Sequence, residues 1–181
     1  MDGYITTYTK IHMQPLKPKK EDISIEDIAH ALSMMTRANG HFPKFYSVAQ
    51  HCLHCYEEAK ARGANRTTML ACLLHDASEA YLADITRPVK QYLPKYLEIE
   101  EGLQNAIYNK YLGDSVSVEN LKWVKEIDDA LLYHEFHFYM HEKLMEDEPI
   151  LKSNPVFQLE DMKCVEARFL EVFNELYEGI K

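Results

Sequence analysis

The stretch Met69-Leu-Ala-Cys-Leu-Leu-His75-Asp76-Ala-Ser-Glu79 places an imidazole and two carboxylates directly after an apolar run. Apolar residues recur there at helical spacing and Thr67 or Thr68 is placed to cap the N-terminus, so the pattern predicts a buried helix over about 67–82. Asp76 and Glu79 are three residues apart and would share one face of it. A buried carboxylate is costly unless it is paired or binds a metal, so this stretch is the first candidate for a site.

The segments on either side of this stretch are also helical in pattern. A helix is expected from Ser24 to a stop at Asn39-Gly40, which places Arg37 in its last turn. Further helices are expected over the following ranges: 47–62, 94–112, 117–145 and 158–178. The prediction is an all-α bundle of about six helices. It forms a single domain over 1–181, with a short extended arm over 1–22 and residues 146–181 packing a C-terminal helix on the core.

Composition limits the functional classes. The chain has 181 residues, of which 46% are hydrophobic, and a formal net charge of −9, which disfavours a nucleic-acid-binding surface. No apolar segment reaches membrane-spanning length, so a membrane partner is not expected. The four cysteines lie within helical patterns, which favours reduced thiols and a cytoplasmic location.

His51-Cys52-x-His54-Cys55 has the composition of a zinc cluster. Helical geometry disfavours one, because neighbouring residues point about 100° apart. The sequence also has no second Cys/His pair at zinc-finger spacing.

A different set of residues has the order of a divalent-metal site. His51, the adjacent His75-Asp76 pair and Asp128 would each come from a different helix, with coordination positions left open for water. The metal would be cobalt, manganese, magnesium, zinc or iron.

This arrangement resembles the HD-domain phosphohydrolase superfamily. The segment His75-Asp-Ala-Ser-Glu-Ala-Tyr-Leu-Ala-Asp84-Ile-Thr-Arg-Pro-Val-Lys90 is similar to the signature of its 5′-deoxynucleotidase branch, and Tyr46-Ser-Val-Ala-Gln-His51 is similar to the upstream part of small phage and bacterial members. The likeness covers about 22–136 and fades after 145.

The resemblance implies roles for individual residues. His51, His75, Asp76 and Asp128 would be the metal ligands, although Asp129 adjoins Asp128. Glu79 would orient or deprotonate the metal-bound water, and Asp84 would be a second acid/base group near the leaving oxygen. Arg37, Arg87 and Lys90 would bind the phosphate, although Ala38 stands where family members have a tryptophan after the arginine.

The expected activity is metal-dependent hydrolysis of a nucleoside phosphate. One version is a 5′-deoxynucleotidase that releases phosphate from a deoxynucleoside monophosphate. Another is a triphosphohydrolase that releases triphosphate from a deoxynucleoside triphosphate, as implied by phage relatives that remove dATP. A third is a regulatory domain that binds the metal or nucleotide without turnover. A homodimer or larger homo-oligomer is expected from the apolar last helix.

Overall fold

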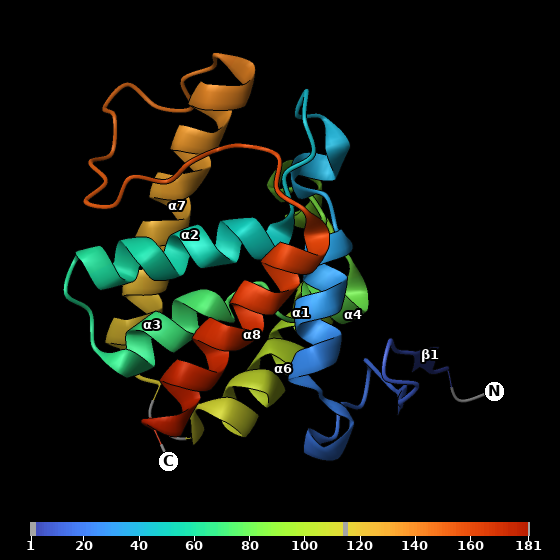
Figure 1. The fold of residues 1–181 in the computed structure, drawn as a ribbon. Helices are drawn as coiled ribbons and strands as arrows, with labels where there is room; N and C mark the ends of the chain where they lie inside the picture. Colours follow the sequence, from blue (N-terminus) through green and yellow to red (C-terminus); the bar gives the residue numbers. More distant parts are fainter. Residues whose placement is uncertain (1–2, 114–115, 181) are drawn as a thin grey trace.

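The computed structural model describes residues 3–113 and 116–180, which fold into a helical bundle (Figure 1). The all-α prediction is confirmed, and the β structure in the described part is a two-stranded hairpin and an isolated bridge between Thr36 and Ser47. In chain order the elements are β1 (Ile5–Thr6), β2 (His12–Met13), η1 (Lys20–Asp22), α1 (Ile25–Met34), η2 (Arg37–Gly40), α2 (Val48–Ala61), α3 (Arg66–Leu73), α4 (Glu79–Leu82), α5 (Arg87–Lys90), α6 (Pro94–Tyr111), α7 (Val118–Met140) and α8 (Met162–Glu178).

The helix expected over 67–82 is broken. α3 begins after Asn65, whose side chain caps it in place of the expected Thr67 or Thr68, and it ends at Leu73. The chain then turns through His75 and Asp76 before α4. Cys72 O accepts a hydrogen bond from His75 Nδ1 at 2.8 Å, whereas in a continuous helix it would accept one from the amide of residue 76.

Side chains of α6 satisfy the backbone groups that this break leaves open. Gln104 Nε2 donates to Leu74 O at 2.7 Å, and Gln104 Oε1 accepts from Ser78 N at 3.1 Å. Tyr108 Oη donates to Ala71 O at 3.2 Å. The break therefore depends on tertiary contacts with α6.

Arg37 lies outside α1, contrary to the prediction. Ser24 caps α1 as expected, but the helix ends at Met34 and Arg37 begins the short 3-10 turn η2. Arg37 N donates to Tyr46 O at 2.8 Å, so the backbone here is held against the segment leading into α2.

The other helix starts follow local sequence signals. Ser47 and Ser117 each form a capping box, with Gln50 and Asn120 respectively. α7 ends at Met140, five residues before the expected Met145. The next residue, His141, adopts a left-handed conformation. α8 begins only at Met162, after the cap Asp161.

The core lies between α3 and the helices that pack on it, α2, α7 and α8. The apolar stripe of α8 is buried within this chain, at Val165, Phe169, Phe173 and Leu176. The N-terminal arm is tied to α1 because Asp27 accepts hydrogen bonds from the amide and hydroxyl of Thr9.

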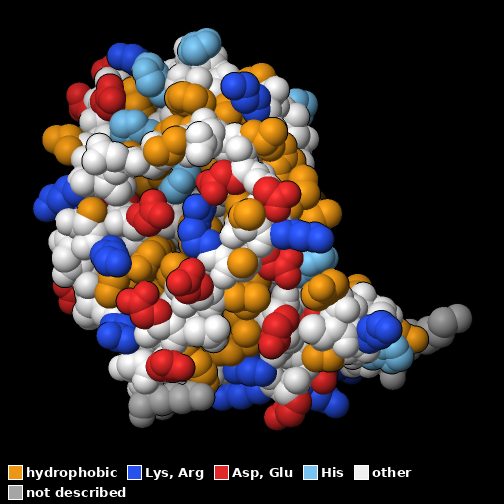
Figure 2. Space-filling model, in the orientation of Figure 1, with side chains coloured by type: hydrophobic (Ala, Val, Ile, Leu, Met, Phe, Trp, Pro, Cys, Tyr) orange, Lys and Arg blue, Asp and Glu red, His pale blue; other side chains and the backbone are white. Residues whose placement is uncertain are grey.

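Acidic and basic side chains are interspersed over the face of the molecule shown in Figure 2. Among the described residues, no helix combines the length and the apolar character needed to cross a membrane.

Candidate metal centre

The four expected metal ligands converge. His51 projects from α2, His75 and Asp76 from the turn after α3, and Asp128 from α7. His51 Nε2 lies 3.2 Å from His75 Nε2 and 3.2 Å from Asp128 Oδ1. Asp76 Oδ2 lies 3.3 Å from His75 Nε2 and 3.9 Å from His51 Nε2. Donor atoms that bind one ion at about 2.1 Å are separated by such distances.

Hydrogen bonds orient both imidazoles toward one another. His75 Nδ1 donates to Cys72 O, and His51 Nδ1 lies 2.5 Å from Glu135 Oε1. In each neutral ring this leaves the lone pair on Nε2, the atom that faces the other ligands. Both rings therefore present the nitrogen that a metal would bind.

Glu135 is a fully buried partner that the ligand prediction did not include. It is seven residues from Asp128 on α7, so the two carboxylates lie on one stripe of the helix. Its carboxylate accepts from Tyr46 Oη at 3.1 Å and from Arg37 Nε at 3.3 Å, as well as facing His51. It thereby holds three neighbours of the centre in place.

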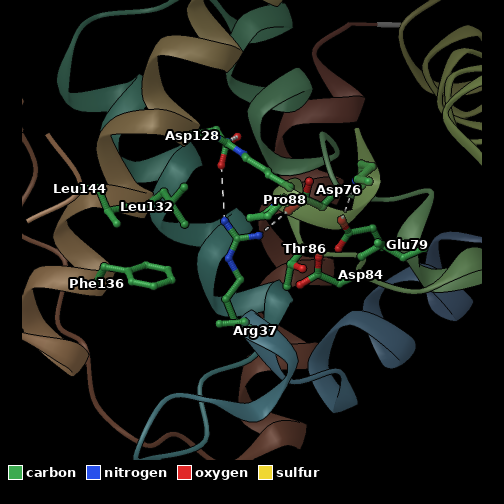
Figure 3. Close-up of a pocket in the computed structure, with 14 residues that line it drawn as sticks. Arg37, Asp76, Glu79, Asp84, Thr86, Pro88, Asp128, Leu132, Phe136 and Leu144 are labelled. Atoms are coloured by element: carbon green, nitrogen blue, oxygen red, sulfur yellow. Dashed lines mark hydrogen bonds and ion pairs between the residues drawn. The ribbon is translucent and has the colours of Figure 1, made fainter. Parts of the chain in front are cut away.

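Arg37 lies in the middle of the acidic groups (Figure 3). Its guanidinium is 3.2 Å from Asp76 Oδ2, 3.4 Å from Asp128 Oδ1 and 3.0 Å from His51 Nε2. One arginine thus faces three carboxylates, counting Glu135. The remaining negative charge, together with two imidazole nitrogens, fits a divalent cation.

This negative charge acts on the ionisable groups. Burial opposes protonation of His75, but Asp76 and nearby groups raise the pKa of its imidazole well above the usual value. Burial likewise opposes ionisation of Asp128, but hydrogen bonds from His51 and His75 hold the pKa of Asp128 well below the usual value. Protons and metal ions therefore compete for the same nitrogen atoms.

Asp128 and Asp129 face different surroundings. Asp128 Oδ1 faces the imidazoles and Asp128 Oδ2 pairs with Arg87 at 2.5 Å. Asp129 pairs with Arg87 at 2.6 Å and with Lys125 at 2.8 Å, on the outer side of α7. The geometry favours Asp128 as the ligand.

The expected catalytic carboxylates, Glu79 and Asp84, line a cavity of about 420 Å³. Asp76 and Asp128 line the same cavity. Glu79 Oε2 is buried without a hydrogen-bond partner among the described residues, and Glu79 Oε1 lies 3.9 Å from Lys90 Nζ. Burial, then the charges of Asp76 and Asp84, raises the pKa of Glu79 well above the usual value. Burial also raises the pKa of Asp84. The unpaired oxygen is suited to a water or a substrate proton.

Backbone strain occurs next to two cavity residues. Ala38 follows Arg37 with φ 53°, and Ala83 precedes Asp84 with φ 108° and ψ 153°. The second conformation is one that essentially only glycine adopts readily. Strain of this kind is concentrated at functional sites in proteins.

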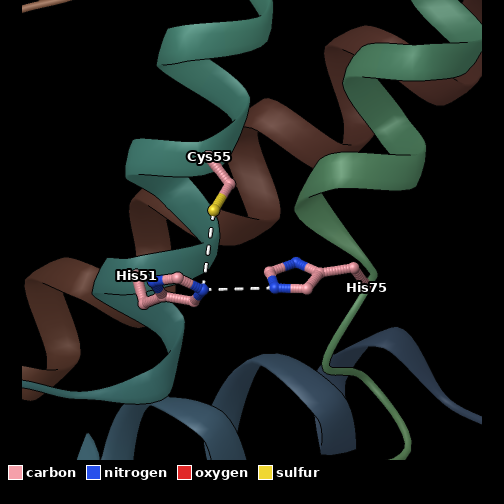
Figure 4. A group of neighbouring side chains, drawn as sticks. All are labelled: His51, Cys55 and His75. Atoms are coloured by element: carbon pink, nitrogen blue, oxygen red, sulfur yellow. Dashed lines mark hydrogen bonds between the residues drawn. The ribbon is translucent and has the colours of Figure 1, made fainter. Parts of the chain in front are cut away.

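Sulfur atoms offer two alternative donor groups. Cys55 Sγ lies 3.5 Å from His51 Nε2 (Figure 4), and Cys52 Sγ lies 4.0 Å from His75 Nδ1. Three-residue groups that can hold an ion are His51/Cys55/His75 and Cys52/His75/Asp76. His54 belongs to neither group, and its Nδ1 bonds to Tyr46 Oη at 2.9 Å. The i, i+4 spacing of His51 and Cys55 on α2 is the sequence signal for their proximity.

Comparison with known proteins gives relatives without assigned activities. No family model matches the chain. It is 41% identical over 109 residues to a protein of Escherichia coli (strain K12) named "Uncharacterized protein YfdR", covering 60% of this chain and 58% of that protein. It is 42% identical over 102 residues to "Uncharacterized protein RCAP_rcc00048" of Rhodobacter capsulatus, covering 53% and 52%. The chain thus matches somewhat over half the length of these curated relatives.

Proposed function

We propose that this chain is a divalent-metal-dependent phosphohydrolase that acts on nucleoside phosphates, as a 5′-deoxynucleotidase releasing phosphate from a deoxynucleoside monophosphate. The observation that carries the proposal is the convergence of His51, His75, Asp76 and Asp128 beside a cavity that also contains Glu79 and Arg37. The sequence resemblance agrees with this arrangement.

The bound cation would supply a water of lowered pKa and would polarise a phosphoryl oxygen. Side chains of the protein would transfer the protons. Glu79, with one buried oxygen unpaired, can accept a proton from the attacking water. Asp84, which lines the same cavity, can return a proton to the leaving oxygen. Both carboxylates are buried enough to favour a bound proton.

The cationic side chains would bind the phosphate. Arg37, Arg87 and Lys90 all line the cavity. Arginine forks match phosphate oxygens in geometry as well as charge. Each of them now contacts carboxylates, including Asp76 for Arg37, Asp128 for Arg87 and Glu100 for Lys90. Together with a bound divalent cation, these three side chains would let a chain of net charge −9 bind an anion.

The experiment is a panel of mono-, di- and triphosphates of ribo- and deoxynucleosides, assayed with cobalt, manganese or magnesium. Release of inorganic phosphate from deoxynucleoside monophosphates supports the proposal. Release of triphosphate would replace it with the triphosphohydrolase version. Metal and nucleotide binding without any product would replace it with the regulatory version.

Matched variants test the assigned roles. Asp128→Asn should lower the metal content, whereas Asp129→Asn should leave it near the wild-type value, because Asp129 faces Arg87 and Lys125. Glu79→Gln should retain metal and lose about 100-fold or more in kcat. Equal metal content in both aspartate variants contradicts the ligand assignment, and undiminished turnover in Glu79→Gln excludes it as the base.

A further inference from the structure

We infer that the cavity binds a nucleobase at its apolar end, with Phe136 as the surface on which the base stacks. This inference rests on the proposed function, since it identifies the part of the substrate remote from the phosphate. Leu132, Phe136 and Leu144 line the same cavity as Asp76 and Glu79. In Figure 3 these three apolar side chains lie on the left, opposite Asp76, Glu79 and Asp84, with Arg37 between the two sides.

The apolar end is aligned with the metal centre by α7. Asp128, Leu132 and Phe136 are spaced four residues apart, so they form one stripe along the helix. At 1.5 Å per residue, Phe136 lies about 12 Å along the axis from Asp128. That distance leaves room for a sugar between a phosphate at the ionic end and a ring at Phe136. A pentose phosphate alone would leave the apolar end uncovered.

The ring of Phe136 is held in place from its outer side. It packs edge-on against Phe42 with ring centroids 5.3 Å apart, and Phe42 in turn stacks on Tyr139 at 4.7 Å. Phe42 and Tyr139 are buried. Phe136 is only partly buried and lines the cavity. A fixed aromatic surface of this kind loses little conformational entropy when a base stacks on it.

The shape and charge of the cavity favour one occupant. Its volume, about 420 Å³, is that of a site for a single small molecule rather than a peptide or a helix. Leu144, 40% exposed, forms part of the apolar end and would be covered by the ligand. A molecule with a phosphate at one end and a flat ring at the other complements both ends. A nucleoside monophosphate has this form.

The test compares a deoxynucleoside monophosphate with deoxyribose 5-phosphate, which lacks the base. Phe136→Ala should raise KM for the nucleotide about tenfold or more, since aromatic stacking on a base is worth that much. It should leave kcat/KM for deoxyribose 5-phosphate unchanged, and Phe136→Tyr should restore the wild-type KM. Phe138→Ala is the matched control, because Phe138 is on the same helix, 50% exposed and outside the cavity lining.

A binding measurement separates this inference from the proposed function. Titration of the metal-loaded protein with a deoxynucleoside, which carries no phosphate, should show binding that Phe136→Ala weakens and Phe138→Ala retains. An unchanged KM in a folded Phe136→Ala variant, or equal kcat/KM for the nucleotide and the base-free phosphate, overturns the base site and leaves the phosphohydrolase proposal standing. Nucleoside binding that depends on Phe136, without turnover of any phosphate ester, supports the base site and overturns the proposed hydrolysis.

Discussion

Glu135 Oε1 lies 2.5 Å from Nδ1 of His51, and both side chains are completely buried. The two residues are 84 positions apart in the chain, on α7 and α2. Because the carboxylate holds the proton on Nδ1, the other nitrogen of His51 is left to face His75 and Asp128. Glu135 would therefore prepare His51 to bind the proposed metal ion.

Replacement of Glu135 should weaken metal binding without removing a ligand. Glu135→Gln is expected to lower metal affinity about 10- to 100-fold, the usual effect of losing such a partner. Competition with a chromophoric chelator measures it. Glu126→Gln, an exposed residue of the same helix, should have no effect. Equal affinities for both variants would show that His51 needs no orienting carboxylate.

Cys55 provides a test between the two kinds of donor set. If the ion is held by His51, His75, Asp76 and Asp128, Cys55→Ser should retain the wild-type metal content. The cobalt-loaded protein should then lack a thiolate-to-metal absorption band. A strong band that disappears in Cys55→Ser but persists in a variant of the exposed Cys164 would assign the sulfur as a ligand instead.

Gln104 should be important for stability because it bonds to both sides of the break after α3. Gln104→Leu leaves Ser78 N without its hydrogen-bond partner, whereas Leu74 O still accepts from the amide of Ala77. An unpaired buried polar group costs about 1–3 kcal/mol. Urea unfolding should show a loss of that size. The control is Gln91→Leu, since the exposed Gln91 side chain bonds to the nearby Pro88 O; a similar loss there would remove the special role of Gln104.

Ala83 adopts a glycine-like conformation, so Ala83→Gly should stabilise the fold. Relief of strain is worth about 1–3 kcal/mol, and the extra freedom of glycine in the unfolded chain offsets about 0.5–1 kcal/mol of that. A net gain of about 1 kcal/mol is expected in urea unfolding. Ala106→Gly, inside α6, should lose about 1 kcal/mol. A loss at both positions would argue against strain at Ala83.

The lowered pKa of His54 predicts how the stability of the fold responds to acid. Burial is the main cause that lowers its pKa from 6.5 to about 4. Between these values the unfolded chain binds a proton that the folded chain does not, so stability falls as the pH drops from about 6.5 to 4. The full contribution is roughly 3 kcal/mol. Between pH 7 and pH 5, His54→Gln should lose less stability than the wild type. An equal loss in both would place the acid sensitivity elsewhere.

The sequence by itself determined the features that arise from local interactions. Ser24, Ser47 and Ser117 cap helices because each bonds to an amide three residues away, so the caps could be predicted from adjacent residues. The helical spacing of apolar residues, which predicts a bundle, is likewise a property of residues close together in the chain. The order of His51, His75-Asp76 and Asp128 also suggested which side chains to expect in one site.

Tertiary structure decided where these side chains meet and which residues surround them. The apolar pattern over 67–82 predicts an unbroken helix, but Gln104 and Tyr108 of α6 satisfy the carbonyls that the break exposes. Arg37 lies outside its predicted helix and contacts the carboxylates of the candidate centre. Pairings such as His51 with Glu135 join residues far apart in the chain, and no local periodicity encodes them, because the free energy that holds them comes from packing distant helices together.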